Sequence, residues 1–249
     1  MPNIFALLVG IDQYPEGVPP LAGCGNDIGA FETYLHERVG RSAIDLRVES
    51  LRDTGATRQN IIDGFRKHLS EAKEDDVALF YYSGHGSQNH TPPEFWYLEP
   101  DHLDETLVCH DSRLAGKYDL ADKELAVLIA EVAKKNPHVL VILDCCHSGS
   151  GTRAPIAGGA AAVRRAITDV RVRPIDSYLA PGRDLERFVT AKSGKQYEWL
   201  MLPRGRHIVM AACRATRPAR KCSCGFCLRR LSRGVPYRAC PRRGSPRRP

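Results

Sequence analysis

A histidine and a cysteine each follow an apolar run of strand length. His85 comes just after the run 77–82 and has a glycine on either side, and Cys146 comes just after the run 138–143. A cysteine thiolate is a strong nucleophile, and a nearby imidazole can carry the protons that its reactions move. The residues therefore predict a cysteine hydrolase. Residue types alone leave a second interpretation open, in which His85 is a loop histidine and Cys146 a small buried apolar side chain.

Apolar runs and helix-spaced apolar residues alternate along the chain and predict the elements that position this pair. Strands are expected over 4–11, 44–51, 77–82, 138–143 and 208–212, helices over 26–38, 57–72 and 122–134, and a small hairpin arm at 105–108. Thr57 and Asp122 are the expected N-caps of the last two helices. The alternation indicates βαβ units and a mainly parallel α/β sheet, whose functional residues gather at the carboxyl ends of the strands.

Length, apolar runs and cysteine count restrict the class of protein. The 249 residues suffice for one large domain or two small ones. No apolar run reaches the ~20 residues that span a bilayer, and the first residues lack the pattern of a signal peptide. The nine cysteines are an odd number, which argues against a disulfide framework. We therefore expect a cytoplasmic protein with reduced thiols and no membrane partner.

The end of the chain differs in composition from the rest. Residues 217–249 contain eleven Lys or Arg and no acidic residue, so the net charge of +7 arises from this tail. The tail lacks apolar periodicity and is predicted to be disordered. Nucleic-acid binding would rest on the tail alone and is disfavoured. A zinc site at its cysteines is disfavoured too, because their spacing lacks paired Cys-x-x-Cys hooks; these are Cys222, Cys224, Cys227 and Cys240.

Five short motifs occur in order along the chain. They are ALLVGIDQY at 6–14, LAGCGND at 21–27, SGHGSQ at 83–88, DETL at 104–107 and DCCHSG at 144–149. Over residues 3–214 the sequence resembles the caspase-like cysteine peptidases, most closely metacaspases and their bacterial relatives. The resemblance implies a caspase-hemoglobinase-like three-layer α/β/α sandwich, with His85 as catalytic histidine and Cys146, not Cys145, as nucleophile. Backbone N–H groups of Gly86 and Cys146 are expected to hold the oxyanion of the attacked carbonyl.

The resemblance also divides the chain. Residues 1–216 are the expected peptidase domain, with a loop or linker excursion at 150–200, and residues 217–249 are the basic tail. Relatives usually continue with a final helix and strand, which the tail does not resemble. We therefore expect an aberrant terminus, of the kind that a shifted reading frame produces. Without those elements, a caspase-like module that no longer cleaves and serves as a binding or regulatory domain is the competing function.

Substrate preference follows from charge at positions that match the family. Metacaspases cleave after Arg or Lys through acidic residues in the substrate pocket, and the matching positions are Asp27 and Asp144, with Ser83 nearby. Carboxylates attract a guanidinium or ammonium group and repel an acidic side chain. The expected partners are therefore proteins or peptides with basic residues. The alternatives are that Asp27 only stabilises a helix N-terminus and that Asp144 only forms a turn.

Calcium is a separate question, because many metacaspases are activated by Ca²⁺. Asp104 and Asp122 match the family's metal-binding acids, but Lys123 stands where a second acid is usual. Since Ca²⁺ takes about 6–8 oxygen ligands, the two acids are better interpreted as solvated surface carboxylates. No cofactor is expected in the chemistry itself, and activation by Ca²⁺ stays open.

Overall fold

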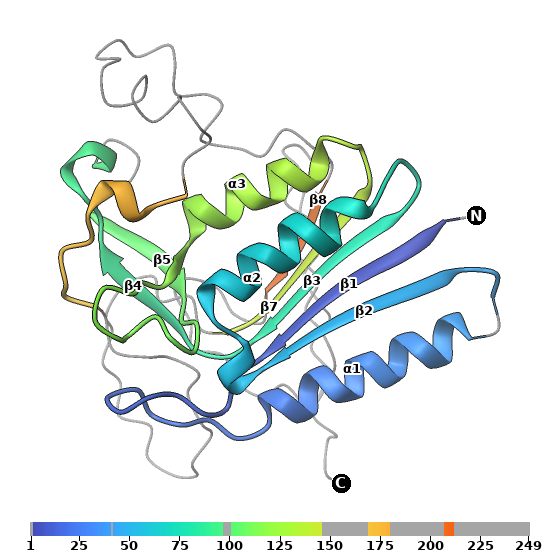
Figure 1. Cartoon of the computed structure of the whole chain (residues 1–249), viewed down its shortest axis with the longest axis horizontal. Coiled ribbons are helices and arrows are strands. Elements are labelled where there is room, and N and C mark those ends of the chain that lie inside the picture. The colour runs from blue at the N-terminus through green and yellow to red at the C-terminus, as the bar shows by residue number, and fades with distance from the viewer. Residues whose placement is uncertain (1, 41, 97–100, 146–168, 180–206, 212–249) are drawn as a thin grey trace, which may run out of the picture.

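A five-stranded parallel sheet forms the centre of the molecule, in the order β2-β1-β3-β7-β8 (Figure 1). The computed structural model describes residues 2–40, 42–96, 101–145, 169–179 and 207–211. Cys146, most of the predicted excursion, the expected boundary at 216 and the tail lie outside these residues. All five predicted strands are confirmed to within one residue at their ends: β1 is Asn3–Gly10, β2 Asp45–Arg52, β3 Val77–Ser83, β7 His138–Asp144 and β8 His207–Ala211.

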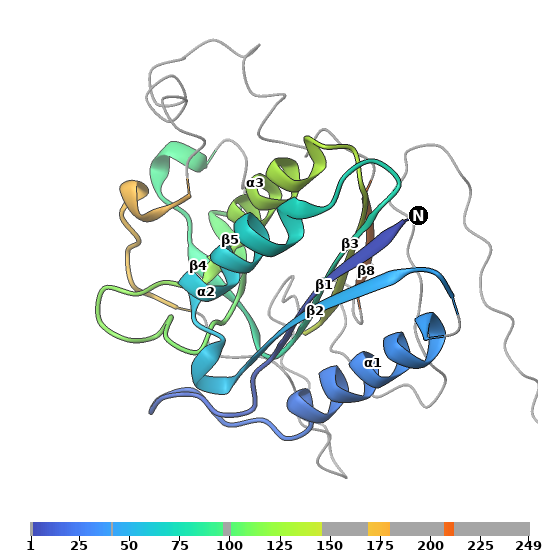
Figure 2. The ribbon, with the colours of Figure 1, turned by 45° about the vertical axis from the view of Figure 1, so that its right-hand side comes forward.

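Helices cover both faces of this sheet (Figures 1 and 2). They are α1 (Cys24–Val39) on one face and α2 (Arg58–Asp63) and α3 (Asp122–Ala133) on the other. Side chains alternate along a strand, so Leu7 of β1 packs with the α2–α3 layer and Leu8 packs with the α1 layer. Both leucines are fully buried. A strand that is covered on both faces needs apolar residues at every position, which is the continuous run seen in the sequence.

The helix starts have different causes. The carboxylate of Asp12 accepts the N–H groups of Cys24 and Gly25 at the start of α1, each at 2.9 Å. Thr57 is the N-cap of α2, as predicted, and its hydroxyl accepts the N–H of Asn60 at 3.2 Å. After α2, a π-helical turn (Gly64–His68) and a 3₁₀ turn (Leu69–Glu71) complete the helical segment expected to Ala72.

The start of α3 differs from the prediction by one position. Asp122 is the first helical residue rather than the cap, and Ala121 holds the N-cap position. The side chain of Glu124 accepts the N–H of Ala121 at 2.8 Å. The acid three residues into the helix therefore satisfies the terminus from inside, as in a capping box.

A small antiparallel sheet, in the order β4-β5-β6, lies beside the main one. Its strands are β4 (Gly86–His90), β5 (Leu103–Leu107) and β6 (Leu120–Ala121). The predicted hairpin arm corresponds to β5, whereas β4 has a polar sequence that no apolar pattern marks. Gly86 pairs with Leu107, so this sheet begins at the residue after His85.

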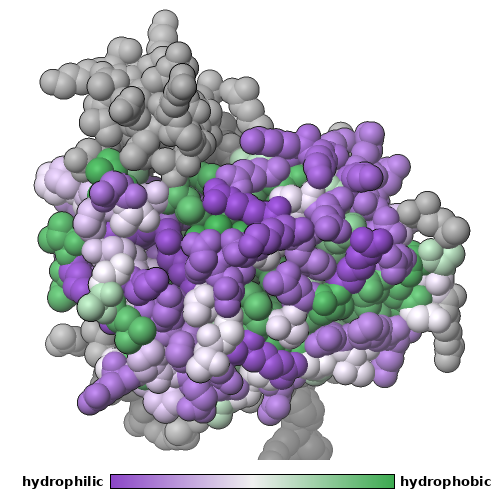
Figure 3. All heavy atoms as spheres, in the orientation of Figure 1, coloured by the Kyte–Doolittle hydropathy of each residue, from purple (hydrophilic) through white to green (hydrophobic). Residues whose placement is uncertain are grey.

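The surface separates polar from apolar residues. Hydrophilic side chains cover most of the face in Figure 3, and apolar ones show mainly between the helical layers, where the sheet lies. The longest helix of the described residues, α1, has 16 residues, and no helix in that part of the chain is long and apolar enough to cross a membrane.

Candidate active site

The carboxyl ends of β3 and β7 form one edge of the main sheet. The two strands are parallel neighbours, and Ser83 at the end of β3 is the register partner of Asp144 at the end of β7. His85 lies two residues beyond Ser83. Cys145 follows Asp144 and is the last described residue before Cys146. The register therefore brings the histidine and the start of the cysteine segment to the same sheet edge, as the sequence predicts.

His85 is buried and held at three atoms. Its side-chain Nε2 lies 2.8 Å from the carbonyl oxygen of Pro19, and its backbone N–H donates to the Tyr14 hydroxyl at 3.0 Å. The Tyr82 hydroxyl donates to the His85 carbonyl oxygen at 2.8 Å. Because a carbonyl oxygen only accepts, the proton of a neutral His85 ring is on Nε2, and Nδ1 carries the lone pair.

Gly84 lets two tyrosine hydroxyls approach the backbone before His85. A Cβ at this position would lie 2.6 Å from the Tyr82 hydroxyl oxygen and 2.8 Å from that of Tyr14. Both distances are too short for a real contact, so any larger residue would displace the hydroxyls that hold His85. Burial raises the pKa of Tyr14 and of Tyr82 well above their ordinary value, so both hydroxyls stay protonated at neutral pH.

Pro19 is a contact that the sequence did not indicate. It lies in the segment between β1 and α1, whose course is fixed by Asp12: the Asp12 carbonyl accepts the Leu21 N–H at 2.8 Å, and the Asp12 N–H donates to Asp53 at 2.9 Å. This bracing places the Pro19 carbonyl against the imidazole. The interacting atom belongs to the backbone, so no residue type marks it.

The three predicted substrate-binding residues lie at the same sheet edge. Ser83 is buried at the end of β3, and its hydroxyl is 3.5 Å from a carboxylate oxygen of Asp27 in the first turn of α1. Asp144 is the neighbour of Ser83 across the sheet, and both carboxylates belong to half-buried residues. The edge next to His85 therefore carries one acid whose carboxylate lies near the Ser83 hydroxyl and a second acid at the register partner of Ser83.

The two predicted calcium ligands differ in environment. Asp104 on β5 is fully buried, which corrects the expectation of a surface carboxylate, whereas the Asp122 side chain is 47% exposed. The ammonium nitrogen of Lys123 lies 2.7 Å from Asp104 and 3.6 Å from Asp122. Among the described residues, no group of three or more His, Cys, Asp or Glu side chains is arranged to hold a metal ion.

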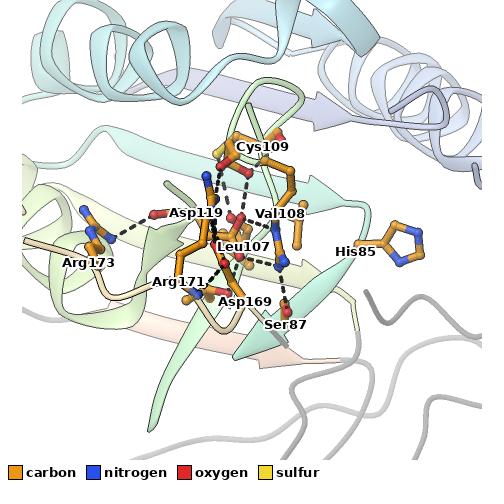
Figure 4. Close-up of polar contacts among 12 residues, drawn as sticks. His85, Ser87, Leu107, Val108, Cys109, Asp119, Asp169, Arg171 and Arg173 are labelled. Atoms are coloured by element: carbon orange, nitrogen blue, oxygen red, sulfur yellow. Dashed lines mark hydrogen bonds and ion pairs between the residues drawn. The ribbon is translucent and has the colours of Figure 1, made fainter. Parts of the chain in front are cut away.

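A buried polar cluster behind β4 was also missed by sequence reasoning. Arg113 donates to Ser87 of β4 at 2.8 Å and pairs with the buried Asp119 at 2.7 Å. Figure 4 shows His85 at the edge of this region, apart from the cluster. The contacts fix β4 directly after the His85 loop, and the long-range pairing left no local pattern that could have predicted it.

Known proteins are similar to this chain in sequence. A family model described as "Metacaspase, peptidase C14 domain" matches residues 5–155. Metacaspase-1A of Aspergillus oryzae is 32% identical over 154 residues, and Metacaspase-1 of Schizosaccharomyces pombe is 31% identical over 156 residues. Each alignment covers 60% of this chain but only 35% of the relative, so the chain spans about a third of their length.

One similar solved structure is a crystal structure of a Geobacter sulfurreducens protein. It is 30% identical, has a TM-score of 0.48, and the match covers 60% of this chain and 52% of that one. The matched family region includes β1, β3 with His85, and β7 with the segment that follows it. Because the family model covers more than half of the sequence, the chain belongs to the metacaspase family of C14 peptidases and has its caspase-like α/β fold.

Proposed function

We propose that this domain is a cysteine endopeptidase that cleaves proteins or peptides after Arg or Lys. The observation that carries the proposal is the register of β3 with β7, which pairs Ser83 with Asp144. From that pair, His85 and Cys146 are each two residues along the chain. The family membership and the three contacts that hold His85 support the same assignment.

In the proposed reaction His85 first takes the proton of the Cys146 thiol, and the resulting thiolate attacks the peptide carbonyl carbon to form a C–S bond. Backbone N–H groups of Gly86 and Cys146 stabilise the negative charge that develops on the carbonyl oxygen. His85 gives a proton to the leaving amine, the C–N bond breaks, and a thioester remains. His85 then takes a proton from water, whose oxygen attacks the thioester and releases the acid product and the thiolate. No cofactor takes part in these steps.

Specificity for basic residues is proposed from Asp27 and Asp144, the two acids that lie with Ser83 at this sheet edge. A guanidinium or ammonium group would contact the carboxylates of Asp27 and Asp144, and an acidic side chain would be repelled. The positive end of the α1 dipole lies near Asp27 and stabilises its charge when no substrate is bound.

We also propose a cytoplasmic setting. In the described part of the chain, Cys24, Cys109 and Cys145 are all buried, and Cys109 is a free thiol. Burial raises the pKa of the Cys109 thiol well above its ordinary value, which keeps it protonated and unreactive. Such cysteines are typical of proteins in a reducing compartment.

The test is cleavage of three fluorogenic peptides that differ only in having Arg, Lys or Asp before the scissile bond. The full chain should release the fluorophore from the Arg and Lys peptides and not from the Asp peptide, and the Cys146→Ala variant should cleave none. Faster cleavage of the Asp peptide would contradict the specificity. Binding of the Arg peptide without any cleavage would favour the non-cleaving binding module instead.

A further inference from the structure

Residues 169–179 cross the outside of the small sheet and reach α3, and we call this segment the strap (Figures 1 and 4). It begins at β4, where Asp169 forms a bridge with Asn89 and its N–H donates to the Gln88 carbonyl at 2.9 Å. Arg171 donates to the carbonyl oxygens of Ser112 and Leu114, each at 2.9 Å. The strap is therefore bound along its length although it has little regular structure.

The first buried anchor of the strap is an arginine. The Arg173 guanidinium is fully buried and pairs with Glu124 of α3 at 2.8 Å. Its guanidinium carbon also lies over the Tyr178 ring, 3.7 Å from the ring centroid. Glu124 is fully buried, pairs with Arg58 as well, and accepts the N–H of Leu179 at 2.8 Å. This carboxylate is therefore matched by two guanidinium groups and by two backbone donors, the N–H groups of Leu179 and Ala121.

The second buried anchor is the carboxylate of Asp104 on β5. One of its oxygens accepts the Tyr178 hydroxyl of the strap at 2.6 Å. The other accepts the Thr91 hydroxyl at 2.6 Å and the Lys123 ammonium at 2.7 Å. The Lys123 side chain is only 9% exposed, so this ion pair is formed inside the protein. Tyr178 thus docks on a carboxylate whose charge is already balanced by a lysine.

Charge balance decides what else can bind there. A buried carboxylate needs a counter-ion, and at Asp104 this is Lys123. A divalent cation on the same oxygens would have to displace the ammonium group, and Arg58 and Arg173 already balance Glu124 on the same helix. Ca²⁺ also needs about 6–8 oxygen ligands, whereas both oxygens of Asp104 already accept hydrogen bonds. The residues present therefore do not fit calcium.

We infer that the Lys123 ammonium acts as an internal cation that holds the strap on β5, so that docking of the strap requires no calcium. The strap starts at β4, whose first residue follows His85, and the chain that begins with Cys146 leads into it. The docking itself does not depend on the proposed peptidase activity, and any effect on cleavage rests on that proposal.

Hydrogen exchange of the strap amides tests the inference without a substrate. The full chain carries Cys146→Ala to prevent self-cleavage, and exchange of 169–179 is compared in excess EGTA and in millimolar Ca²⁺. Protection should be the same in both. In Lys123→Met the charge of Asp104 loses its partner, and exchange of the Tyr178 and Leu179 amides should be about 10- to 100-fold faster. The matched control is Lys67→Met, which removes a lysine whose side chain is 75% exposed.

Two outcomes would overturn the inference. The first is that Ca²⁺ increases the protection of the strap amides in the protein that keeps Lys123. The second is that the strap amides of Lys123→Met are protected as strongly as those of the protein that keeps Lys123. If Lys123→Met does not fold, Tyr178→Phe is used instead, because this variant loses only the hydroxyl that donates to Asp104 and keeps the ion pair of Lys123 with Asp104. Amide exchange in the strap of Tyr178→Phe should be faster, while the α3 amides stay protected. Unchanged exchange of the strap amides in this variant contradicts the proposed anchor. None of these readouts changes if the chain fails to cleave peptides.

Discussion

The carbonyl oxygen of Pro19 lies 2.8 Å from Nε2 of His85, across 66 positions of sequence. This contact fixes which ring nitrogen carries the proton and how the ring is turned. Tyr14 acts on the same residue from the backbone side, because its hydroxyl accepts the His85 N–H. The catalytic geometry that we propose therefore depends on the segment between β1 and α1, which contains no catalytic group itself.

Tyr14→Phe should impair both stability and catalysis. It removes the acceptor of the buried His85 N–H, and a buried donor without a partner costs about 1–3 kcal/mol. We expect a lower free energy of unfolding in urea, and a lower kcat with little change in KM, because the histidine is displaced and the substrate pocket is not. Tyr34→Phe, at a 49% exposed position, is the matched control. Equal effects of the two variants would contradict a specific role for Tyr14.

Asp27→Ala should weaken the cleavage of basic substrates. Loss of one charge-assisted contact costs roughly 1.5–3 kcal/mol, so kcat/KM for an Arg peptide should fall about tenfold or more. Glu37→Ala removes the same charge from an exposed position of the same helix and should have little effect. Steady-state kinetics on Arg and Lys peptides make the comparison. If the two variants behave alike, Asp27 stabilises only the helix terminus.

The elements that bury apolar side chains on both faces were predictable, and the polar contacts that connect them were not. The continuous apolar runs of β1, β3 and β7 gave a direct signal, and Thr57 marked its helix. β4 carries a polar sequence, because it is held by Arg113 and by the strap rather than by a core. Arg173 lies in a stretch without periodicity, and its partner Glu124 is 49 positions away.

Within the candidate site, residue types located the side chains but not their environment. Ser83, Asp27 and Asp144 were proposed from their motifs, and they lie at one sheet edge because strands β3 and β7 end in register. The burial of Asp104 was missed, since a carboxylate followed by polar neighbours looks exposed until its partner Lys123, 19 positions away, is known. Pro19 was missed because its contribution is a backbone oxygen.

Asp76 should make stability depend on pH in the acid range. Hydrogen bonds from the N–H of Lys73 and from Asn3 lower the pKa of its carboxyl below the ordinary value. Because the pKa of Asp76 is lower in the folded protein, its stabilising effect is present when the pH is above the pKa of an unfolded Asp, about 3.9. The effect is lost as the pH falls through the pKa of Asp76 in the folded protein.

Asp76→Asn should therefore be less stable than the wild type at neutral pH, and the difference should shrink in acid. Urea unfolding between pH 7 and pH 3 measures it. Asp75→Asn is the control, because it removes the same charge from an exposed neighbouring residue. The backbone φ of Asp75 is 70°, a conformation that Asn also adopts. A difference for Asp76→Asn that stays constant over this range would count against the proposed cause.

The enzyme should cut itself slowly after Arg164 or Arg165, which lie outside the described residues, and not after Arg171 or Arg173. The latter two are held in the strap by ion pairs with Asp169 and Glu124, and the Arg173 side chain has no exposed surface. Mass spectrometry of the fragments gives their N-termini and so identifies the peptide bond that is cleaved. The Cys146→Ala protein should stay whole, and cleavage in it would indicate a contaminating protease.

We propose that Cys146 is the nucleophile and that His85 is its proton-transfer partner. Peptide mapping by mass spectrometry after reaction with an arginyl chloromethyl ketone identifies the nucleophile, because each of the nine cysteines can be assigned. We expect one adduct on Cys146 in the wild type and in Cys145→Ala, much less adduct in His85→Ala, and none in Cys146→Ala. An adduct on Cys145 that persists in Cys146→Ala, with peptide cleavage intact, would show that Cys145 is the nucleophile instead.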